Sequence, residues 1–469
     1  MQWYGMLAAA VGLMHASSVL ATDDDGSRDD VIDLLRAEVA ELRDVVAELK
    51  AAGDDNWLTA RRAQEIRGLV EDVLADADTR ASLLQEGITA GWDQKFYLGS
   101  ADGNWRLNIG GQLQVRWALN SASGQGAAMP FAIPDTLYGV EVRRAKLKLD
   151  GHVVDPSWQY VLQLAVDHDT PGDGSFEVED AIIGKAFDNG ILVWAGQFKI
   201  EFNREELTSS TSQLAVARSV INEFFNLDRS QGVRVQYTGD RFRVAGVYTD
   251  GASNRWGGFD LSAGPPASAF TGRVDWLASG DWEQFKDFQG WKGGTFGAMI
   301  GAAIHYQESK YGGLNPTGPF STPRTERLTW TIDAQLEGDG WNLFAYVLGN
   351  HISDNAVGSV SADQLAFVVQ GGYMLTDKWD VYLRYEWGDL DDNTSPSAIA
   401  TAATGLTDIS IITVGTNYYV YKHAAKWTTD IGFGLDPVPT NLGLGANWRA
   451  DVAPNDGQIV LRTQFQLLF

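Results

Sequence analysis

The stretch that decides the fold is Gly457-Gln458-Ile459-Val460-Leu461-Arg462-Thr463-Gln464-Phe465-Gln466-Leu467-Leu468-Phe469. From Ile459 onward, apolar side chains occupy every second position, and Thr463 is the only weak member. The polar positions between them are Arg462, Gln464 and Gln466. Because successive side chains of a strand point to opposite faces, this segment predicts a strand with one apolar and one polar face.

A chain that ends on such a strand resembles the bacterial outer-membrane β-barrels, in which a terminal aromatic strand closes the cylinder. In that class the terminal strand also resembles the signal that the barrel-assembly machinery reads. We therefore expect the strand ending at Phe469 to engage that machinery. The alternative is the last strand of a soluble β-sandwich.

Alternation with period two from about Trp92 onward predicts sixteen strands. They are expected at 106–117, 139–150, 157–167, 176–186, 190–199, 230–238, 240–250, 268–278, 295–306, 328–337, 340–350, 363–374, 379–389, 408–421, 422–433 and 457–469. The connections alternate between short and long, as periplasmic turns and outer loops do, except that 279–294 is too long for a turn. The expected fold is a sixteen-stranded antiparallel transmembrane β-barrel over 92–469, closed by pairing of its last strand with its first.

The composition is compatible with this fold and excludes several kinds of site. The 469 residues carry a net charge of −25 and no cysteine, so a disulfide framework and a thiolate metal site are excluded. The acidic balance argues against nucleic-acid binding. The 51 glycines, 17 tryptophans, 15 tyrosines and 20 phenylalanines suit tight turns and aromatic girdles. After the N-terminus no apolar run is long enough for a membrane-spanning helix.

The segment before the barrel divides into three parts. Residues 1–21 have the apolar centre and small-residue end of a signal peptide, and a buried N-terminal helix is the alternative. Residues 22–54 form an acidic segment with three heptads, which favours a coiled coil over a single helix packed on its own chain. Residues 55–91 are expected to form a helical segment, and both helical parts are placed in the periplasm. The heptad positions are Ile32, Leu35, Val39, Leu42, Val46 and Leu49.

Enzymatic motifs are missing from the sequence. It has no glycine-rich phosphate loop, no His-Glu-x-x-His and no nucleophile elbow. The acidic run Asp167-His168-Asp169 faintly suggests a calcium loop, but Pro171 stands where a ligand is needed. We therefore expect no enzyme, no cofactor and no metal site.

Several motifs together resemble the phosphate-selective porin O/P family. They are Val142-Arg143-Arg144-Ala145-Lys146-Leu147-Lys148-Leu149-Asp150-Gly151, Gly196-Gln197-Phe198-Lys199-Ile200-Glu201-Phe202, Glu205-Glu206-Leu207-Thr208-Ser209-Ser210, Asp228-Arg229-Ser230-Gln231-Gly232-Val233, Asn417-Tyr418-Tyr419 and His423-Ala424-Ala425-Lys426. The 282–288 segment also resembles a connection between two strands in that family. This would explain why the connection 279–294 is longer than a turn. The resemblance implies a homotrimeric, sixteen-stranded outer-membrane porin for anions, and the N-terminal helices resemble those of some members.

A pore needs fixed charge at a narrow place, and strand 139–150 offers it. Arg144, Lys146 and Lys148 share one face, opposite an apolar face that must meet lipid, where each cation would cost ~2–4 kcal/mol. The three cations would then form a ladder along the lumen with rungs about 7 Å apart. The alternative is that they only pair with acids across the lumen.

The long connection 200–229 is the second candidate. Lys199 precedes it on the inward face, and its Thr208, Ser209 and Ser210 offer hydroxyls. The resemblance implies that it folds into the barrel and sets the constriction; an ordinary outer loop is the alternative. The further cations expected to line the pore are Arg218, Arg229 and Arg234.

These features predict a passive outer-membrane diffusion channel of a Gram-negative bacterium for small anions, with phosphate or oligophosphate as candidate solutes. Within 92–469, however, 43 acidic residues outnumber 28 basic ones, which weakens the case for phosphate specificity. A general, cation-preferring or sugar porin of the same fold therefore remains an alternative. A third hypothesis is an envelope-tethering protein that acts through its N-terminal helices.

Overall fold

A computed structural model describes residues 87–93, 95–122, 135–166, 176–252, 268–309, 325–354, 360–391, 408–438, 443–449 and 457–469, with a few isolated positions between 36 and 68. None of the helices within these residues is long and apolar enough to cross a membrane. By internal contacts the chain forms two units, Met1–Arg106 and Leu107–Phe469, which are described separately below.

The described elements are mostly long strands. They are β1 (Ile88–Trp92), β2 (Phe96–Ser100), β3 (Arg106–Ser121), β4 (Thr136–Val153), β5 (Asp155–Val166), β6 (Phe176–Ala186), β7 (Ile191–Lys199), α4 (Arg204–Leu207), α5 (Val220–Phe225), β8 (Arg229–Thr238), β9 (Phe242–Thr249), β10 (Ser268–Ser279), η1 (Gln284–Lys286), β11 (Gly297–Ser309), β12 (Thr325–Gly338), β13 (Trp341–Asp354), β14 (Val360–Met374), β15 (Trp379–Asp389), β16 (Asp408–Tyr421), β17 (Ala425–Gly434), α6 (Gly443–Ala446) and β18 (Ile459–Leu468).

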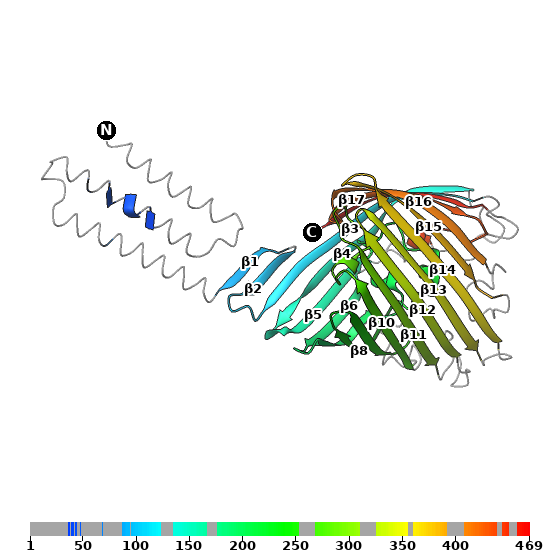
Figure 1. The fold of residues 1–469 in the computed structure, drawn as a ribbon, viewed down its shortest axis with the longest axis horizontal. Helices are drawn as coiled ribbons and strands as arrows, with labels where there is room; N and C mark the ends of the chain where they lie inside the picture. Colours follow the sequence, from blue (N-terminus) through cyan, green and yellow to red (C-terminus); the bar gives the residue numbers. More distant parts are fainter. Residues whose placement is uncertain are drawn as a thin grey trace. The chain divides into compact units, whose positions relative to one another are not determined.

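Strands β3 to β18 form one antiparallel barrel (Figure 1). Each strand pairs with the next along the chain, and β18 pairs with β3, which closes the sheet. All sixteen predicted barrel strands are present among the described residues, each within a few residues of its expected bounds. Closure leaves no unpaired sheet edge, which a structure in lipid requires because unsatisfied backbone groups there cost several kcal/mol each.

The seam between β18 and β3 confirms the pairing expected from the last stretch of sequence. Ile459 pairs with Ser121 and Leu468 with Gln112. Beyond them, the Phe469 N–H donates to the Gly111 carbonyl at 3.1 Å, and the Gly111 N–H donates to the Phe469 carbonyl at 2.6 Å. A Cβ added at Gly111 would lie 2.2 Å from the Phe469 ring, so the ring would have to shift to make room for any other residue there.

The barrel wall is apolar outside and polar inside, as β12 shows. Leu328, Trp330 and Ile332 are exposed on its outer face, whereas the alternate positions are buried. Those inward positions are Thr329, Thr331, Asp333, Gln335 and Glu337. This inversion of the soluble-protein pattern is what a transmembrane barrel requires, with lipid outside and a polar lumen.

The N-terminal unit differs from the prediction. Strands β1 and β2 form a hairpin in which Trp92 pairs with Phe96. Residues 88–91 of the segment expected to be helical, 55–91, therefore lie in a strand, and the barrel begins at β3 instead of residue 92. The run Ile88-Thr89 is β-branched and Gly91 disfavours a helix, so the local propensity agrees with a strand. The expected signal peptide 1–21 and most of segments 22–54 and 55–91 lie outside the described residues.

Candidate functional site

The connection between β7 and β8 turns into the barrel, which confirms the inward loop that the sequence left open. Its side chains Phe202, Leu214 and Ile221 are at most 1% exposed and belong to one apolar cluster with Phe344 and Ile411 of the barrel wall. Because the inner wall is otherwise polar, an apolar patch at this place is explained by the loop that covers it. Residues 200–229 therefore cross the lumen and pack against the wall on the side of β12–β18.

Buried polar contacts fix this loop to the wall. The Glu205 carboxylate accepts from the Ser219 N–H at 2.8 Å and from the Tyr346 hydroxyl at 3.0 Å. Glu386 accepts from the Val220 N–H at 2.5 Å, at the start of α5, where free N–H groups favour an anion. Arg384 donates to Glu386 at 3.0 Å and to the carbonyl of the loop residue Ala217 at 2.8 Å. The loop is thus held by charged groups that have no access to water.

The connection 280–296 also enters the lumen, which explains why it is too long for a turn. Its Phe288 is fully buried, with its ring 4.4 Å from that of Phe344, and its N–H points at the Ser212 carbonyl of the long loop at 3.4 Å. Its Asp287 carbonyl accepts from Gln335 of the wall at 2.6 Å. This segment therefore packs against the long loop from the end of the barrel that carries the short turns.

A third inward segment is 443–449, which contains α6. Trp448 is 1% exposed, and the Ala446 carbonyl accepts from Arg462 at 2.8 Å. The Gly445 carbonyl accepts from Arg116 at 3.1 Å. Together the three segments occupy the lumen beside β12–β18.

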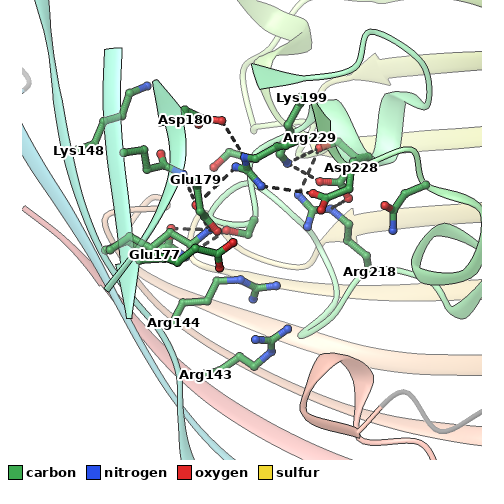
Figure 2. A pocket seen from close by; sticks show the side chains of 18 of the residues that line it. Arg143, Arg144, Lys148, Glu177, Glu179, Asp180, Lys199, Arg218, Asp228 and Arg229 are labelled. Carbon is green, nitrogen blue, oxygen red and sulfur yellow. Dashed lines mark hydrogen bonds and ion pairs between the residues drawn. The ribbon is translucent and has the colours of Figure 1, made fainter. Parts of the chain in front are cut away.

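A cavity lies on the opposite side, between the long loop and strands β3 to β6 (Figure 2). It has a volume of about 420 Å³. Seven of the described residues that line it are basic and six are acidic. The basic ones are Arg143, Arg144, Lys146, Lys148, Lys199, Arg218 and Arg229, and the acidic ones are Glu177, Glu179, Asp180, Glu206, Glu223 and Asp228.

The predicted ladder of β4 lies in this cavity, but its three members have different surroundings. Arg144 donates to Gln114 at 2.9 Å and has no ion-pair partner among the described residues. Lys146 forms an ion pair with Glu179 at 2.6 Å. Lys148 lines the cavity without a hydrogen-bond or ion-pair partner in the described part of the chain. Two rungs of the ladder therefore keep their charge available, and one does not.

Arg143 is a cavity residue that the strict alternation missed. Val142 and Leu147 are both exposed on the outer wall, although strict alternation would place residues five apart on opposite faces. The alternation therefore slips by one position between them, and the consecutive Arg143 and Arg144 both reach the cavity (Figure 2). The gap of three between the apolar Val142 and Ala145 is the sequence signal for this slip.

A second slip occurs on β6 and brings two acids inward. Gln163 of β5 pairs with Asp180, whereas the next residue, Leu164, pairs with Val178, so Glu179 is an extra residue. An extra residue of this kind is a β-bulge, and it lets Glu179 and Asp180 line the cavity together. Arg229, at the start of β8, contacts Asp180 at 2.7 Å and Glu179 at 3.4 Å.

The loop cations are also paired. Lys199 contacts the Glu206 carboxylate at 2.5 Å, and Arg218 contacts it at 3.3 Å. Burial alone would raise the pKa of Glu206, but Arg218 and Lys199 outweigh burial and hold that pKa well below its ordinary value. Arg218 also donates to the Thr208 carbonyl at 3.0 Å, so it holds the loop together as well as lining the cavity.

Glu223, on α5, also lines the cavity, but its surroundings differ from those of Glu206. Its carboxylate has no hydrogen bond or ion pair within the described residues, and burial raises its pKa above the ordinary value. The charges nearest to it include Arg218, Arg143 and Arg144.

Two predicted residues lie elsewhere. Arg234 is on the inner wall but outside the cavity, paired with Glu201 and stacked on the Trp194 ring at 3.6 Å. Thr208 is buried in the loop, where its hydroxyl donates to the Arg204 carbonyl at 3.1 Å, whereas Ser209 and Ser210 do line the cavity.

Comparison with known proteins agrees with this architecture. The family model of phosphate-selective porin O and P matches residues 132–427. No curated protein matches the sequence. An anion-selective porin from Comamonas acidovorans superposes with a TM-score of 0.53 at 13% identity, over 77% of this chain and 99% of that one. OmpT, an outer membrane protein of Vibrio cholerae, gives 0.51 at 14% identity, over 78% and 98%. At such identities the two structures show a shared fold.

Proposed function

The chain belongs to the phosphate-selective porin O and P family, and on this premise we propose that it is an outer-membrane channel through which small anions pass more readily than cations. Channels of this kind work by passive diffusion, so the protein needs a passage and a charge pattern, and it is not an enzyme. The cavity between the long loop and β3–β6 is the proposed filter.

One observation carries the anion preference. Arg144 and Lys148 lie on the cavity wall, and neither has an ion-pair partner in the described residues. Fixed cations at a constriction attract anions and repel cations. Lys146, Lys199 and Arg229 line the same cavity, but neighbouring acids offset their charges.

The test is the reversal potential of the purified channel in a planar bilayer with a potassium chloride gradient. We expect the sign of an anion-preferring pore, and we expect the preference to fall when Arg144, Lys146 and Lys148 are replaced together by Gln. A cation preference in the unaltered protein would favour the second candidate, a general, cation-preferring or sugar porin. The six acids in the cavity lining are the observation that keeps that candidate open.

Phosphate or oligophosphate as the physiological solute is a further proposal. It is supported by the family and by the adjacent guanidinium groups of Arg143 and Arg144, a geometry suited to oxyanions. Competition of phosphate with chloride current would test it.

We also propose a homotrimer whose acidic coiled coil, 22–54, and the helical segment that follows it up to the β1–β2 hairpin extend into the periplasm after removal of residues 1–21. The family resemblance and the heptads support this arrangement. Excising 29–50 should leave the barrel trimeric and conducting, as judged by size in mild detergent and by conductance. A monomer would show that the helices hold the oligomer, and loss of envelope adhesion with unchanged conductance would favour the tethering role.

For assembly, we propose that the barrel-assembly machinery binds the strand ending at Phe469. The seat of Phe469 at the β3–β18 seam supports a role in closure. Phe469→Ser should lower the yield of assembled barrel in the membrane without changing the conductance of each pore.

A further inference from the structure

We propose that the outer wall of the barrel carries a groove that binds one acyl chain of lipid A, the lipid of the outer leaflet in a Gram-negative outer membrane. The groove lies over the neighbouring strands β8 to β11 (Figure 1). The inference rests on the family and the barrel fold, and it does not depend on the proposed ion preference.

The floor of the groove is a pair of glycines on adjacent strands. Gly246 of β9 pairs with Gly272 of β10, and both alternate along their strands with side chains exposed on the outer wall, such as Val244 and Val274. A Cβ added at either glycine would meet no heavy atom of the described residues within 4 Å. Because neighbouring strands are about 5 Å apart, this open floor is wide enough to matter to a molecule lying on it.

An outward-facing glycine elsewhere in the barrel is covered by the protein itself. Gly349 of β13 pairs with Trp330 of β12, and a Cβ added at Gly349 would lie 2.5 Å from that indole ring. An aromatic ring that covers a strand glycine in this way is a common stabilising device in sheets. Gly246 and Gly272 instead pair with each other, so neither supplies a ring for its partner. Only contact with a membrane molecule can restore the van der Waals energy that this floor lacks.

Branched side chains bound the floor on both sides. In the same row across the sheet, Val235 of β8 pairs with Gly246, and Ile304 of β11 pairs with Gly272. Both side chains are exposed on the outer wall. The row therefore runs from one branched side chain over two glycines to another, which makes an apolar groove with a ridge on each side.

An aromatic row marks one end of the groove. Phe270 pairs with both Tyr248 and Tyr306, and its ring lies 5.3 Å from that of Tyr248. All three residues lie within three positions of the strand ends that lead to the long connections 250–267 and 310–324. Long connections are outer loops, and tyrosines near strand ends lie at the membrane interface. The groove therefore begins just inside the outer interface, at the depth of the outer-leaflet acyl chains.

A single acyl chain suits this groove better than a second copy of the protein. A stable interface between proteins buries about 800 Å² on each partner, which is more than ten lining residues can supply. The groove is also continuous with the wall that contacts lipid, because the outward side chains on every strand beside it are apolar and exposed. A membrane lipid therefore reaches it directly.

The test compares the unaltered full-length channel with Gly246→Val/Gly272→Val, which fills the floor with residues that suit a strand. The control is Ala334→Val/Ala345→Val, because these two alanines also pair across adjacent strands, outside the groove. Lipid-free protein in mild detergent is mixed with lipid A or, separately, with dimyristoyl phosphatidylethanolamine. Native mass spectrometry then counts the retained lipids, and heat-dependent mobility on gels checks that each barrel is folded.

We expect the unaltered channel and the alanine-site control to retain one more lipid A per barrel than the glycine-site variant does. Retention of that lipid should weaken about tenfold in the variant, since many small van der Waals contacts across the floor are lost together. Gly246→Ala/Gly272→Ala, whose added methyl groups meet no described atom within 4 Å, should fold in any case and show an intermediate loss.

Three results would overturn the inference. The first is equal retention of lipid A by the unaltered channel, both glycine-site variants and the control. The second is equally tight retention of phosphatidylethanolamine with the same loss in the variants, which would remove the assignment to lipid A. The third is a glycine-site variant that runs as a monomer beside an oligomeric control, because the groove would then be a contact between copies. The reversal potential enters none of these results, so failure of the proposed anion preference is recognised separately.

Discussion

The two sides of the lumen contain the same kinds of charged residue and use them for different ends. Beside β12–β18, the pairs Arg384–Glu386 and Arg462–Asp430 are at most 1% exposed and hold inward segments in place. Beside β3–β6, Lys148 and its neighbours line an open cavity (Figure 2). The number of arginines and lysines in a barrel therefore says little about selectivity until it is known which of them solute can reach.

The charged residues on the two sides of the lumen act differently because they differ in their access to water. A buried ion pair loses its hydration free energy, and only close partners compensate for that loss. Such a pair therefore holds the segments that carry it together. A cation on a wet wall keeps its hydration and acts on passing ions through its field. In this chain the long loop divides the lumen into these two environments.

Releasing the long loop from the wall should change the channel most. Glu386→Ala removes the acceptor at the start of α5 and leaves Arg384 buried without its nearest carboxylate. Breaking a buried pair in this way costs ~3–5 kcal/mol. We expect a lower unfolding temperature of the barrel, a higher single-channel conductance and a weaker ion preference. Glu283→Ala is the control, since its pair with Lys286 is exposed and should contribute ~0–1 kcal/mol. Unchanged conductance in Glu386→Ala would mean that the apolar cluster alone holds the loop.

Neutralising charge on the two sides of the lumen should have different effects. On the open side, the triple change of Arg144, Lys146 and Lys148 to Gln should remove most of the anion preference with the barrel still folded. On the filled side, Arg462→Gln with Asp430→Asn also removes charged groups, but solute does not reach them. We expect that pair of changes to lower stability without moving the reversal potential. A shift of equal size from both sides would show that the filled side also conducts.

Within the ladder, the effects of single changes should differ. Lys148→Gln should lower the chloride-to-potassium ratio about threefold, as expected for a unit charge about 7 Å away in water. Lys146→Gln should lower it less, because Glu179 already offsets the Lys146 charge. If the change at 146 has the larger effect, the ion pair does not persist in the conducting channel.

The fold could be predicted from the sequence because alternation in each strand is a local signal. The pairing of the last strand with the first and the inward loop could also be anticipated, the first from the last strand and the second from family resemblance. The hairpin of β1 and β2 was missed because its five-residue strands are too short for a periodic signal beside a helical segment.

The site was predicted only in part, and the errors have a physical cause. Arg143, Glu179 and Asp180 reach the cavity because the alternation slips, a change that flips every later side chain. The gaps of three between apolar positions, from Val142 to Ala145 and from Val178 to Ala181, carry that signal in the sequence. The contacts of Glu386 and Phe288 with the long loop join residues far apart in the chain, and no local pattern encodes them.

The smallest expected effect concerns pH and the open side. Burial raises the pKa of Glu223, whereas Arg218 and Lys199 hold that of Glu206 low, so Glu223 gains its proton first as pH falls. Protonation removes one negative charge from the cavity. The anion preference should therefore rise as pH falls from neutral toward the pKa of Glu223, before ordinary carboxylates titrate. Reversal potentials over this range measure it.

Glu223→Gln is the control for this pH effect, because it has already lost the charge. Its preference at neutral pH should match that of the unaltered channel at mildly acid pH, about two- to threefold above the neutral value for one charge at roughly 7–10 Å in water. Its pH profile over that range should be flat. A profile as steep as that of the unaltered protein would assign the titration to another cavity acid, with Glu177 the next to replace.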